Sequence, residues 1–459
     1  MAQKRKNSTT ARVQARTHAH RQPRSTSRSQ VSDVAALTLR TSASDPCGVS
    51  AQCGACQHIA KPYEDQLVRK GDEVCQLFVD AGLVSADRVR DLVQPVMGMD
   101  DPHHYRNKVI APFARGKRLS DGKHGARYQI LTGMYAAHSH RIIDSSKCLL
   151  ENTQAQQVVR EVKRLMGSFG IEPYDEDAGE GFLRHVVVRV GHQSGEVLVT
   201  LVTNSEAFPS SRSFCRELKR RCPFITTIVQ NVNTRQTNVI LGDREQRLYG
   251  PGFILDSLGG LSFRISSQSF YQVNATQTEV LYNTAIELAG LDGSQDVIDA
   301  YCGTGTIGLV AASRGARSVI GVDSVESAIR DARENARHNG IENARFVAED
   351  ATAFMRDMVS DGALSDVDEA HDGAAHERAN PLVVFMDPPR AGSTEEFLDA
   401  LVALAPDRVV YISCNPQTQV RDCAYLKQFG YVPHIVIPVD MFPHTDHVEC
   451  VALIAREKG

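Results

Sequence analysis

Cys414 combines a reactive side chain with a position from which it can act. It directly follows the apolar run 408–413, so it stands where a predicted strand ends. A cysteine thiolate can add to an electron-poor carbon and leave again afterwards, which makes it a covalent catalyst. Such chemistry also needs a base, and Glu449 is the candidate, because an acid at the head of an apolar run is costly unless it has a role. His444 and His447, in the polar segment before it, are the alternative bases.

A second chemical group is the carboxylate of Asp387, which follows the apolar run 382–386 and is followed by Pro388-Pro389-Arg390. Proline fixes its backbone angle and donates no hydrogen bond, so a proline pair holds the end of a strand rigidly. The pattern favours an acid held beside a reacting group. The alternative is a proline pair that only terminates the strand.

A glycine-rich turn between an apolar strand and a helix predicts a cofactor crevice. The turn holds four candidate cofactor-binding residues: Tyr301, Gly303, Gly305 and Thr306. Glycine lets the backbone approach a ligand closely, and the N–H groups at the start of the helix face that ligand. The Gly-x-Gly-x-x-Gly spacing over 303–308 also satisfies the dinucleotide fingerprint, so the turn alone does not separate a nicotinamide cofactor from S-adenosylmethionine. Asp323 is placed to bind ribose hydroxyls in either case.

These residues are positioned by apolar strand-like runs that alternate with helical segments, as in the helix predicted over 325–339 between two such runs. This alternation predicts an α/β fold, in which helices cover both faces of a mainly parallel sheet. An acidic segment over 360–380, poor in apolar residues, predicts a surface loop. Ligand and catalytic residues of such sheets gather at the carboxyl ends of the strands. Five candidates fall at predicted strand ends: Asp299, Asp323, Asp350, Asp387 and Cys414.

Three cysteines lie within ten residues at Cys47, Cys53 and Cys56, and Cys148 is the nearest candidate for a fourth ligand. Four thiolates can hold zinc or a 4Fe-4S cluster, and the spacing alone favours neither. The chain has eleven cysteines and no secretion signal, which favours metal ligands, catalysis or reduced thiols over disulfides.

The 459-residue chain divides into three predicted parts: a basic tail over 1–42, an α+β region over 43–264 and an α/β domain over 265–459. The first thirty residues carry eight Lys or Arg and no acid, and their polar composition predicts a disordered arm. A cationic arm attracts phosphate backbones, whereas a solubilising tail or an organelle transit peptide is the alternative. No apolar run approaches the ~18 residues of a membrane helix.

The α+β region is predicted to begin with an amphipathic helix and to continue as a helix and a set of strands. The amphipathic helix covers 63–85, and the strands cover 186–190, 196–202, 226–232 and 238–241. Between the second and third strands, four cations fall at helical spacing on one face: Arg212, Arg216, Lys219 and Arg220. These cations are expected to form a solvated face of the helix. The functional alternative is that the face binds phosphate.

Five motifs, read together, resemble those of the RNA 5-methyluridine methyltransferase family. The motifs are Phe270-x-Gln272-x-Asn274, Asp299-x-Tyr301-Cys302-Gly303-x-Gly305, Asp387-Pro388-Pro389-Arg390-x-Gly392, Ser413-Cys414-Asn415-Pro416 and Asp440-Met441-Phe442-Pro443-x-Thr445-x-His447-x-Glu449. The resemblance runs from about Cys47 to the C-terminus and looks most like the iron–sulfur branch that modifies 23S ribosomal RNA in bacteria. Many relatives carry Glu where this chain has Asp323, and many begin with a small β-barrel where this chain has its basic tail.

The resemblance implies an α/β fold with a Rossmann-like S-adenosylmethionine-dependent methyltransferase sheet, preceded by an α+β domain that carries an iron–sulfur site. It implies that Cys414 adds to carbon 6 of uracil, so that carbon 5 can take the methyl group, and that Glu449 then removes the proton from carbon 5. The S-adenosylmethionine site is expected to comprise Gln272, Tyr301, Gly303, Gly305, Thr306, Asp323, Asp350 and Asp387. The ligands of a 4Fe-4S cluster are expected to be Cys47, Cys53, Cys56 and Cys148.

The function expected from the sequence is therefore methylation of carbon 5 of a uridine in RNA, with 23S ribosomal RNA as the substrate, by a cytoplasmic and monomeric enzyme. Transfer RNA is the alternative substrate. An NAD-dependent oxidoreductase would leave Cys414 and Asp387 without a role. A non-catalytic RNA-binding protein would not need Cys414, Glu449 and Gln272.

Overall fold

The computed structural model describes residues 45–119, 128–360 and 379–457. The basic tail predicted over 1–42 lies outside the described residues, as does most of the surface loop predicted over 360–380. No helix of the described part is long and apolar enough to cross a membrane.

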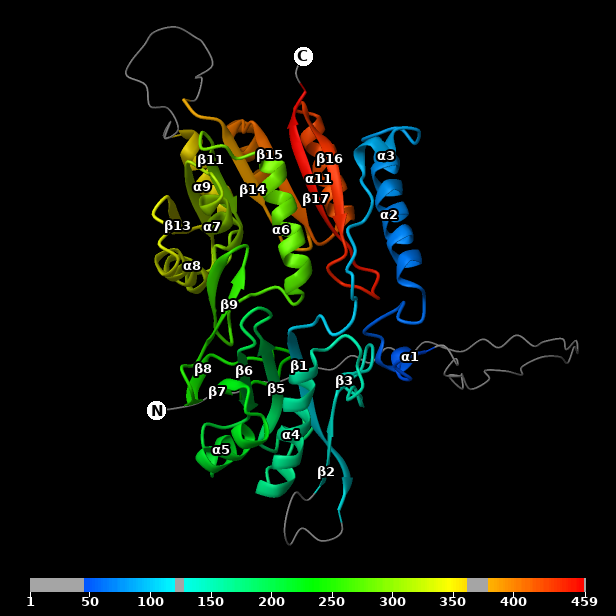
Figure 1. Ribbon diagram of the computed structural model, residues 1–459, viewed down its shortest axis with the longest axis vertical. Helices are drawn as coiled ribbons and strands as arrows, with labels where there is room; N and C mark the ends of the chain where they lie inside the picture. Colours follow the sequence, from blue (N-terminus) through cyan, green and yellow to red (C-terminus); the bar gives the residue numbers. More distant parts are fainter. Residues whose placement is uncertain (1–44, 120–127, 361–378, 458–459) are drawn as a thin grey trace, which may run out of the picture. The chain divides into compact units, whose positions relative to one another are not determined.

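A seven-stranded sheet forms the C-terminal half, with the strand order β13-β12-β11-β14-β15-β17-β16 (Figure 1). Its strands are β11 (Asp296–Ala300), β12 (Ser318–Asp323), β13 (Ala344–Ala348), β14 (Leu382–Met386), β15 (Arg408–Ser413), β16 (Tyr431–Val439) and β17 (Glu449–Arg456). Strands β11 to β15 pair in parallel, which confirms the predicted mainly parallel sheet. Strand β17 runs antiparallel to both β15 and β16.

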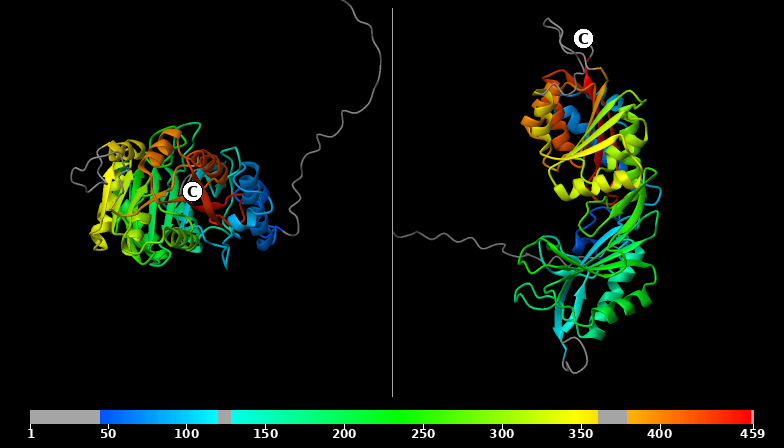
Figure 2. Two further views of the ribbon diagram at one scale, coloured as in Figure 1. Left: turned by 90° about the horizontal axis from the view of Figure 1, so that it is seen from above. Right: turned by 90° about the vertical axis from the view of Figure 1, so that its left-hand side faces the viewer.

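Helices cover both faces of this sheet, as the right-hand view of Figure 2 shows. One face carries α6 (Ala275–Ala289), α7 (Thr306–Ser313) and α8 (Glu326–His338), and the other carries α2 (Tyr63–Asp80), α3 (Val89–Leu92), α9 (Ala351–Ser360), α10 (Glu395–Leu404) and α11 (Pro416–Lys427). The pleat of each strand divides its side chains between the two cores. On β14, Leu382, Val384 and Met386 enter one core, and Val383 and Phe385 enter the other. This double burial explains why the strand is apolar throughout.

Helix α2 is the helix predicted over 63–85, and it ends at Asp80. Its residues Val74 and Phe78 are buried in the same core as β14 and β15, although they stand some three hundred residues earlier in the chain. The segment after α3 continues this contact, because Val93 and Met97 form parallel bridges with β16. The N-terminal helices thus pack against the seven-stranded sheet.

A second, six-stranded sheet has the order β2-β1-β5-β6-β7-β8. Its strands are β1 (Lys108–Arg118), β2 (Tyr128–Thr132), β5 (Leu183–Val190), β6 (Val197–Thr203), β7 (Ile225–Val232) and β8 (Arg244–Tyr249). Helices α4 (Thr153–Phe169) and α5 (Ser211–Arg221) pack on one face of it. The remaining short elements are α1 (Ser50–Cys53) and the strand pair β3 (Met134–Tyr135) and β4 (Ile142–Ile143). The strands predicted over 186–190, 196–202 and 226–232 correspond to β5, β6 and β7.

The strand predicted over 238–241 is wrong. The side-chain amide of Asn233 donates to the carbonyl oxygens of Val239 (2.7 Å) and Ile240 (2.9 Å), so a side chain takes the backbone acceptors that a strand partner would use. The next strand, β8, begins only at Arg244.

A hairpin of β9 (Ile254–Leu258) and β10 (Leu261–Ile265) precedes the seven-stranded sheet in the chain. Its two-residue turn is Gly259-Gly260, and both residues have positive φ (60° and 86°), the conformation that tight hairpin turns require. Ile254 and Ile265 pack with residues of β6 and β7, so the hairpin contributes to the core of the six-stranded sheet.

Candidate active site

The pairing of β15 with β17 brings Cys414 and Glu449 together. Ser413, the last residue of β15, pairs with Cys450 in the antiparallel ladder. Because partners in such a ladder run in opposite directions, the next residue along, Cys414, stands opposite Glu449. The carboxylate of Glu449 is almost fully buried, with 4% of the residue exposed, while Cys414 is partly buried. The two residues predicted to do chemistry therefore lie side by side at one strand end.

The electrostatics of this site follow from burial and from shared negative charge. Burial, together with the charge of Asp387, raises the pKa of Glu449 to about 8. Burial also raises the pKa of Asp387 to about 7. Burial raises the pKa of the Cys414 thiol, and Glu449 and Asp387 add to this shift, whereas the guanidinium of Arg390 opposes it. The thiolate is therefore favoured when the neighbouring carboxyls are protonated or are compensated by a positive charge.

The Asp387-Pro388-Pro389-Arg390 segment is tied to the turn that carries Cys414. The side-chain amide of Asn415 donates to the backbone oxygen of Arg390 at 3.1 Å, and the backbone N–H of Asn415 donates to Ser413 Oγ at 3.1 Å. The Arg390 side chain reaches His447, with 3.0 Å between Nη2 and Nδ1. These contacts hold two strand-end turns, and their reactive groups, against each other.

The glycine-rich turn after β11 forms a cradle of backbone groups. Gly303 and Gly305 both have positive φ (53° and 78°). A Cβ atom on Gly303 would meet nothing within 4 Å, whereas one on Gly305 would lie 2.7 Å from the ring of Phe346. Gly305 is therefore required by the packing of the protein, and Gly303 leaves open space where a ligand can approach the backbone.

Asp323 lies beside this cradle and organises it. Its Oδ2 accepts from the N–H of Gly303 at 2.9 Å, and its Oδ1 accepts from the N–H of Val325 at 2.8 Å. A carboxylate has about four acceptor sites, so both oxygens can still accept ribose hydroxyls.

Asp299 was recognised in the sequence as a strand-end acid but was not among the predicted cofactor residues. Its Oδ2 accepts from the N–H of Gly308 at 2.8 Å, while its buried Oδ1 has no hydrogen-bond partner among the described residues. Burial raises the pKa of Asp299 to about 7, opposed by the Gly308 bond and assisted by the charges of Asp387 and Asp323. An unpartnered buried oxygen at the mouth of the cradle is suited to a ligand that donates a hydrogen bond or carries a positive charge.

Tyr282 of α6 was not identified from the sequence. Its ring is buried, and its pKa is raised by burial and by the charges of Asp387, Glu449 and Asp299, so it lies among all three carboxylates. Nothing in the sequence separates it from the apolar residues of the same helix, because its spacing is that of a core position.

The other predicted cofactor residues have distinct local roles. Asp350 caps α9, since its Oδ1 accepts from the N–H groups of Thr352 (3.0 Å) and Ala353 (3.1 Å). Tyr301 packs against Phe397, with 5.2 Å between the ring centroids. Burial, assisted by the charge of Asp350, raises the pKa of Tyr301 to about 12.

The remaining two are Thr306 and Gln272. Thr306 begins α7, with its hydroxyl 3.3 Å from that of Thr304. The backbone oxygen of Gln272 accepts from the side-chain amide of Asn107 at 3.0 Å, which ties this segment to the start of β1.

The loop between β16 and β17 is locked by a buried ion pair. Lys70 of α2 lies 2.7 Å from Asp440, measured from Nζ to Oδ1, and both side chains are fully buried. The hydroxyl of Tyr63 donates to the other Asp440 oxygen at 2.9 Å. Gln66, also on α2, lies 3.2 Å from His444, and burial lowers the pKa of this histidine to about 4. His444 thus packs against α2 within the loop that leads to Glu449.

The four predicted metal ligands come from two segments that lie near each other in the structure, but their side chains are not arranged around a common centre. Burial, followed by the charges of Cys47, Cys148 and Cys53, raises the pKa of the Cys56 thiol to about 12, so each of the other three thiols lies within electrostatic reach of Cys56. Asp45 orders the first of them, accepting from the N–H of Cys47 at 3.1 Å. Within the described ranges, however, no three His, Cys, Asp or Glu side chains are placed to hold a metal ion.

Comparison with known proteins agrees with this geometry. The sequence profile of the tRNA (Uracil-5-)-methyltransferase family matches residues 257–457. An uncharacterized RNA methyltransferase of Halalkalibacterium halodurans is 41% identical over 409 residues, which are 89% of this chain and 82% of that protein. An uncharacterized RNA methyltransferase of Clostridium acetobutylicum is 38% identical over 410 residues, 89% of this chain and 83% of that protein.

The fold is also that of a solved enzyme. The crystal structure of Pyrococcus abyssi tRNA (uracil-54, C5)-methyltransferase in complex with S-adenosyl-L-homocysteine aligns with a TM-score of 0.66 and 25% identity, over 89% of this chain and 86% of that one. The predicted α/β methyltransferase fold is thereby confirmed. Together, these relatives and the strand-end chemistry place the chain in the RNA uracil-C5 methyltransferase family, as an S-adenosylmethionine-dependent enzyme.

Proposed function

We propose that this enzyme transfers a methyl group from S-adenosylmethionine to carbon 5 of a uridine through a covalent bond between Cys414 and carbon 6 of the uracil ring. The observation that carries the proposal is the β15–β17 register, which puts the thiol of Cys414 opposite the buried carboxyl of Glu449. A nucleophile and a base at one strand end are the two groups that this substitution needs.

The reaction follows from what each side chain can do. The Cys414 thiolate adds to carbon 6 and converts carbon 5 into an enolate-like nucleophile. S-adenosylmethionine, when bound, would supply an electrophilic methyl group on its sulfonium. Carbon 5 would bond to this methyl as the methyl–sulfur bond breaks, and S-adenosylhomocysteine would be the leaving group. Glu449 then takes the proton from carbon 5, and the Cys414 thiolate leaves as the ring double bond re-forms. The raised pKa of Glu449 suits a group that must accept a proton near neutral pH.

The residues around the glycine cradle fit the cofactor by their chemistry. The unpartnered oxygen of Asp299 and the carboxylate of Asp387 provide negative charge for the sulfonium and amino group. Asp323 holds the ribose, and Gly303 leaves room for the ligand against the backbone. The predicted cofactor set also includes Gln272, Tyr301, Gly305, Thr306 and Asp350.

We further propose that Cys47, Cys53, Cys56 and Cys148 hold a 4Fe-4S cluster in the region 43–264, ahead of the catalytic domain over 265–459. Four thiols from two distant segments, within electrostatic reach of one another, have the donor chemistry of such a cluster. The donor set fits, although the side chains would have to turn toward a common centre. No catalytic step requires the cluster, so its role would be structural.

The substrate proposed is 23S ribosomal RNA, supported by the resemblance to the iron–sulfur branch. Transfer RNA is the second candidate, because the solved Pyrococcus abyssi relative is a transfer RNA enzyme.

The test uses anaerobically purified protein, labelled S-adenosylmethionine, and unmodified 23S ribosomal RNA and transfer RNA in parallel. Label is expected in 5-methyluridine of the ribosomal RNA. The variant Glu449→Gln should accumulate a protein–RNA adduct that resists denaturing electrophoresis, while Cys414→Ala should form none. Cys75→Ala, which removes a buried thiol from α2, serves as the control and should behave as the parent does.

Each other outcome is informative. Label only in transfer RNA would move the substrate to the second candidate. Methylation by Cys414→Ala would contradict the covalent mechanism, and the absence of label from both RNAs, with cofactor bound, would contradict the function.

A further inference from the structure

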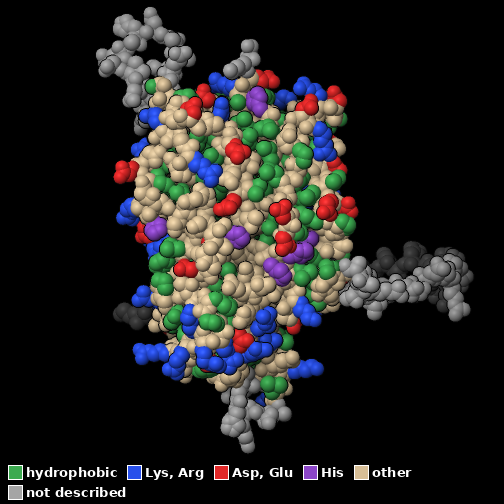
Figure 3. Space-filling view, in the orientation of Figure 1, with side chains coloured by type: hydrophobic (Ala, Val, Ile, Leu, Met, Phe, Trp, Pro, Cys, Tyr) green, Lys and Arg blue, Asp and Glu red, His purple; other side chains and the backbone are tan. Residues whose placement is uncertain are grey.

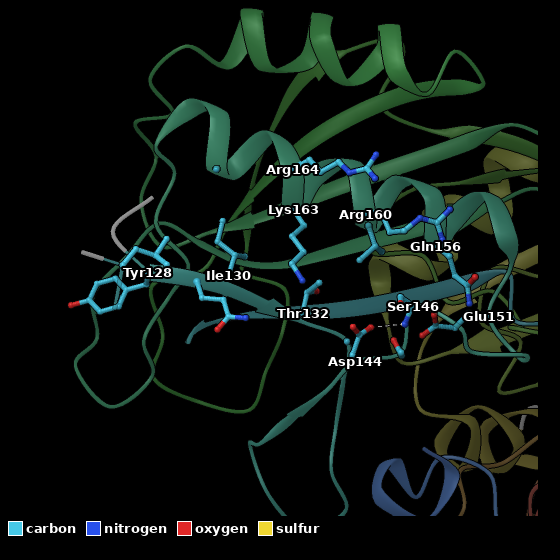
Figure 4. Close-up of a pocket in the computed structure, with 16 residues that line it drawn as sticks. Tyr128, Ile130, Thr132, Asp144, Ser146, Glu151, Gln156, Arg160, Lys163 and Arg164 are labelled. Atoms are coloured by element: carbon cyan, nitrogen blue, oxygen red, sulfur yellow. Dashed lines mark hydrogen bonds between the residues drawn. The ribbon is translucent and has the colours of Figure 1, made fainter. Parts of the chain in front are cut away.

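A cleft of about 760 Å³ lies outside the catalytic site, between α4 and strand β2. Figure 4 shows its two walls: the helix lies on one side and the strand on the other, and the segment with Asp144 and Ser146 approaches the strand. The volume is that of pockets which enclose a single small molecule or a single residue of a polymer.

The helix wall of the cleft is cationic. Lys163 and Arg164 stand three and four residues after Arg160, so both are neighbours of Arg160 on the surface of α4. Arg164 is paired with Glu161 at 2.6 Å, whereas Arg160 and Lys163 take part in no salt bridge of the described part of the chain. Figure 4 shows Lys163 reaching from the helix toward Thr132 across the cleft. Two cations without ion-pair partners at the edge of a cavity are suited to phosphate.

The inner surface of the cleft combines apolar and hydrogen-bonding groups. Ile130 and Val159 face it from the strand and the helix, and Tyr128 adds an aromatic ring. The buried hydroxyl of Thr132 has no hydrogen-bond partner among the described residues, so it is available to a ligand. A planar, partly polar group such as a nucleobase satisfies both kinds of surface.

The surroundings of the cleft favour RNA over a free metabolite. Helices α4 and α5 together carry eight Lys or Arg and two acids. Figure 3 shows Lys and Arg side chains gathered in a band over this part of the molecule. A broad cationic surface attracts a polyanion, and a concave site within it selects a nucleotide that is not held in a duplex.

We propose that this cleft binds one unpaired nucleotide of the RNA substrate, with its phosphate at Arg160 and Lys163 and its base against the apolar surface of Ile130 and Val159. The inference rests on the RNA substrate of the proposed function and adds a second point of contact, separate from the uridine that is methylated. It gives Arg160 and Lys163 a specific phosphate contact, in addition to the general attraction of RNA by the cations of α4 and α5.

The first test fills the cleft without changing its charge. Gly167 of α4 lines the cleft, and a Cβ atom there would meet nothing within 4 Å, so Gly167→Leu adds bulk to the cavity without a clash and improves helix propensity. Binding of a fluorescein-labelled single-stranded RNA decamer of mixed sequence should weaken by about tenfold, the effect of losing one stacked base. A duplex of the same sequence should bind equally well to parent and variant.

The second test compares two matched charge changes. The variant Arg160→Gln/Lys163→Gln should weaken decamer binding and lower the salt dependence of log K by about 0.7, the value for the one phosphate that the protein no longer neutralises. The control Arg212→Gln/Arg216→Gln removes two charges from exposed positions of α5 and should change both quantities far less. All variants should keep the affinity for S-adenosylhomocysteine and the melting temperature of the parent.

The proposal is overturned if Gly167→Leu binds the decamer as tightly as the parent, or if the two double variants behave alike. Competition by millimolar adenosine monophosphate equal to that by RNA would also overturn it, in favour of a free-nucleotide site. These results are distinct from a failure of the proposed function. A protein that methylates uridine but is insensitive to Gly167→Leu refutes the cleft alone, and the opposite pattern refutes the methylation alone.

Discussion

The buried pair of Lys70 and Asp440 should be the most sensitive single contact between α2 and the loop between β16 and β17. The perturbation is to remove one partner at a time. In Lys70→Met, the Asp440 carboxylate would keep, among the described residues, the hydroxyl of Tyr63 at 2.9 Å as its side-chain partner. In Asp440→Asn, the Lys70 ammonium would keep the backbone oxygen of Phe442 at 3.3 Å and would face a neutral amide.

The magnitude follows from the full burial of both side chains. Leaving one charge of such a pair uncompensated costs about 3–5 kcal/mol. We expect Lys70→Met near the lower value, because the Tyr63 bond is charge-assisted, and Asp440→Asn near the upper value. In the double variant Lys70→Met/Asp440→Asn no charge is left buried, so its loss of stability should be smaller than the sum of the single losses by about 2 kcal/mol or more.

The assay is thermal unfolding, followed through the transition that S-adenosylhomocysteine shifts upward, since that transition reports the cofactor-binding domain. A loss of about 3 kcal/mol should lower this midpoint by ~6–12 °C for a domain of roughly 200 residues. The control is Arg90→Met. Arg90 of α3 forms an ion pair with Asp72, which lies on the same helix as Lys70, and both side chains of this pair are more than half exposed. It should change the free energy of unfolding by less than about 1 kcal/mol. Equal effects of Lys70→Met and Arg90→Met, or strict additivity in the double variant, would refute the reasoning.

Three further predictions concern the crevice and the thiols. Gly305→Ala should weaken S-adenosylhomocysteine binding and lower the melting temperature, because its Cβ atom would lie 2.7 Å from the ring of Phe346 at a φ of 78°; an unchanged melting curve would contradict this. Cys53→Ser should lower the iron content of anaerobically purified protein, as measured by iron analysis, and unchanged iron would exclude this thiol as a ligand. The pKa values of Glu449 (about 8) and Asp387 (about 7) are raised above those of the unfolded chain, so the folded state holds extra protons between about pH 4 and pH 8. Stability of the cofactor-free protein should therefore fall as the pH rises through this window, which melting curves from pH 5 to pH 8.5 would detect.

The parallel sheet could be predicted from the sequence because its central strands β11 and β14 and its strand β15 are buried on both faces. The apolar runs that became β12, β14 and β15 have the length of strands and are separated by helical segments, which leaves few other arrangements. The strand order could not be predicted in the same way, since it depends on which crossovers reverse direction. The strand expected over 238–241 failed because its backbone oxygens are held by the side chain of Asn233, an interaction that leaves no periodic signal.

The candidate site was partly predictable for a similar reason. The carboxyl ends of parallel strands share one edge of the sheet, so acids that follow such strands meet there. The position of Glu449 opposite Cys414 depends on the antiparallel return of β17, which the sequence did not predict. The resemblance implied only the roles of these two residues. Tyr282 and Lys70 were missed because each occupies a helix position that looks like ordinary core or surface. Their partners stand far away in the chain, and only the packed structure pairs them.

The contacts of the cysteine segment connect it with the loop that leads to Glu449, the proposed base. His58, two residues after Cys56, donates its backbone N–H to the oxygen of His444 at 3.0 Å, and its ring lies 2.5 Å from Asp446. The hydroxyl of Tyr105 donates to the oxygen of Pro443 at 3.2 Å. These bonds all end on the loop that leads to Glu449, and none of them touches the glycine cradle between β11 and α7. Disorder of the cysteine segment should therefore displace Glu449, the proposed base, before it disturbs the cofactor site. In this way four cysteines that lie far from Cys414 in the sequence could affect the proposed proton transfer.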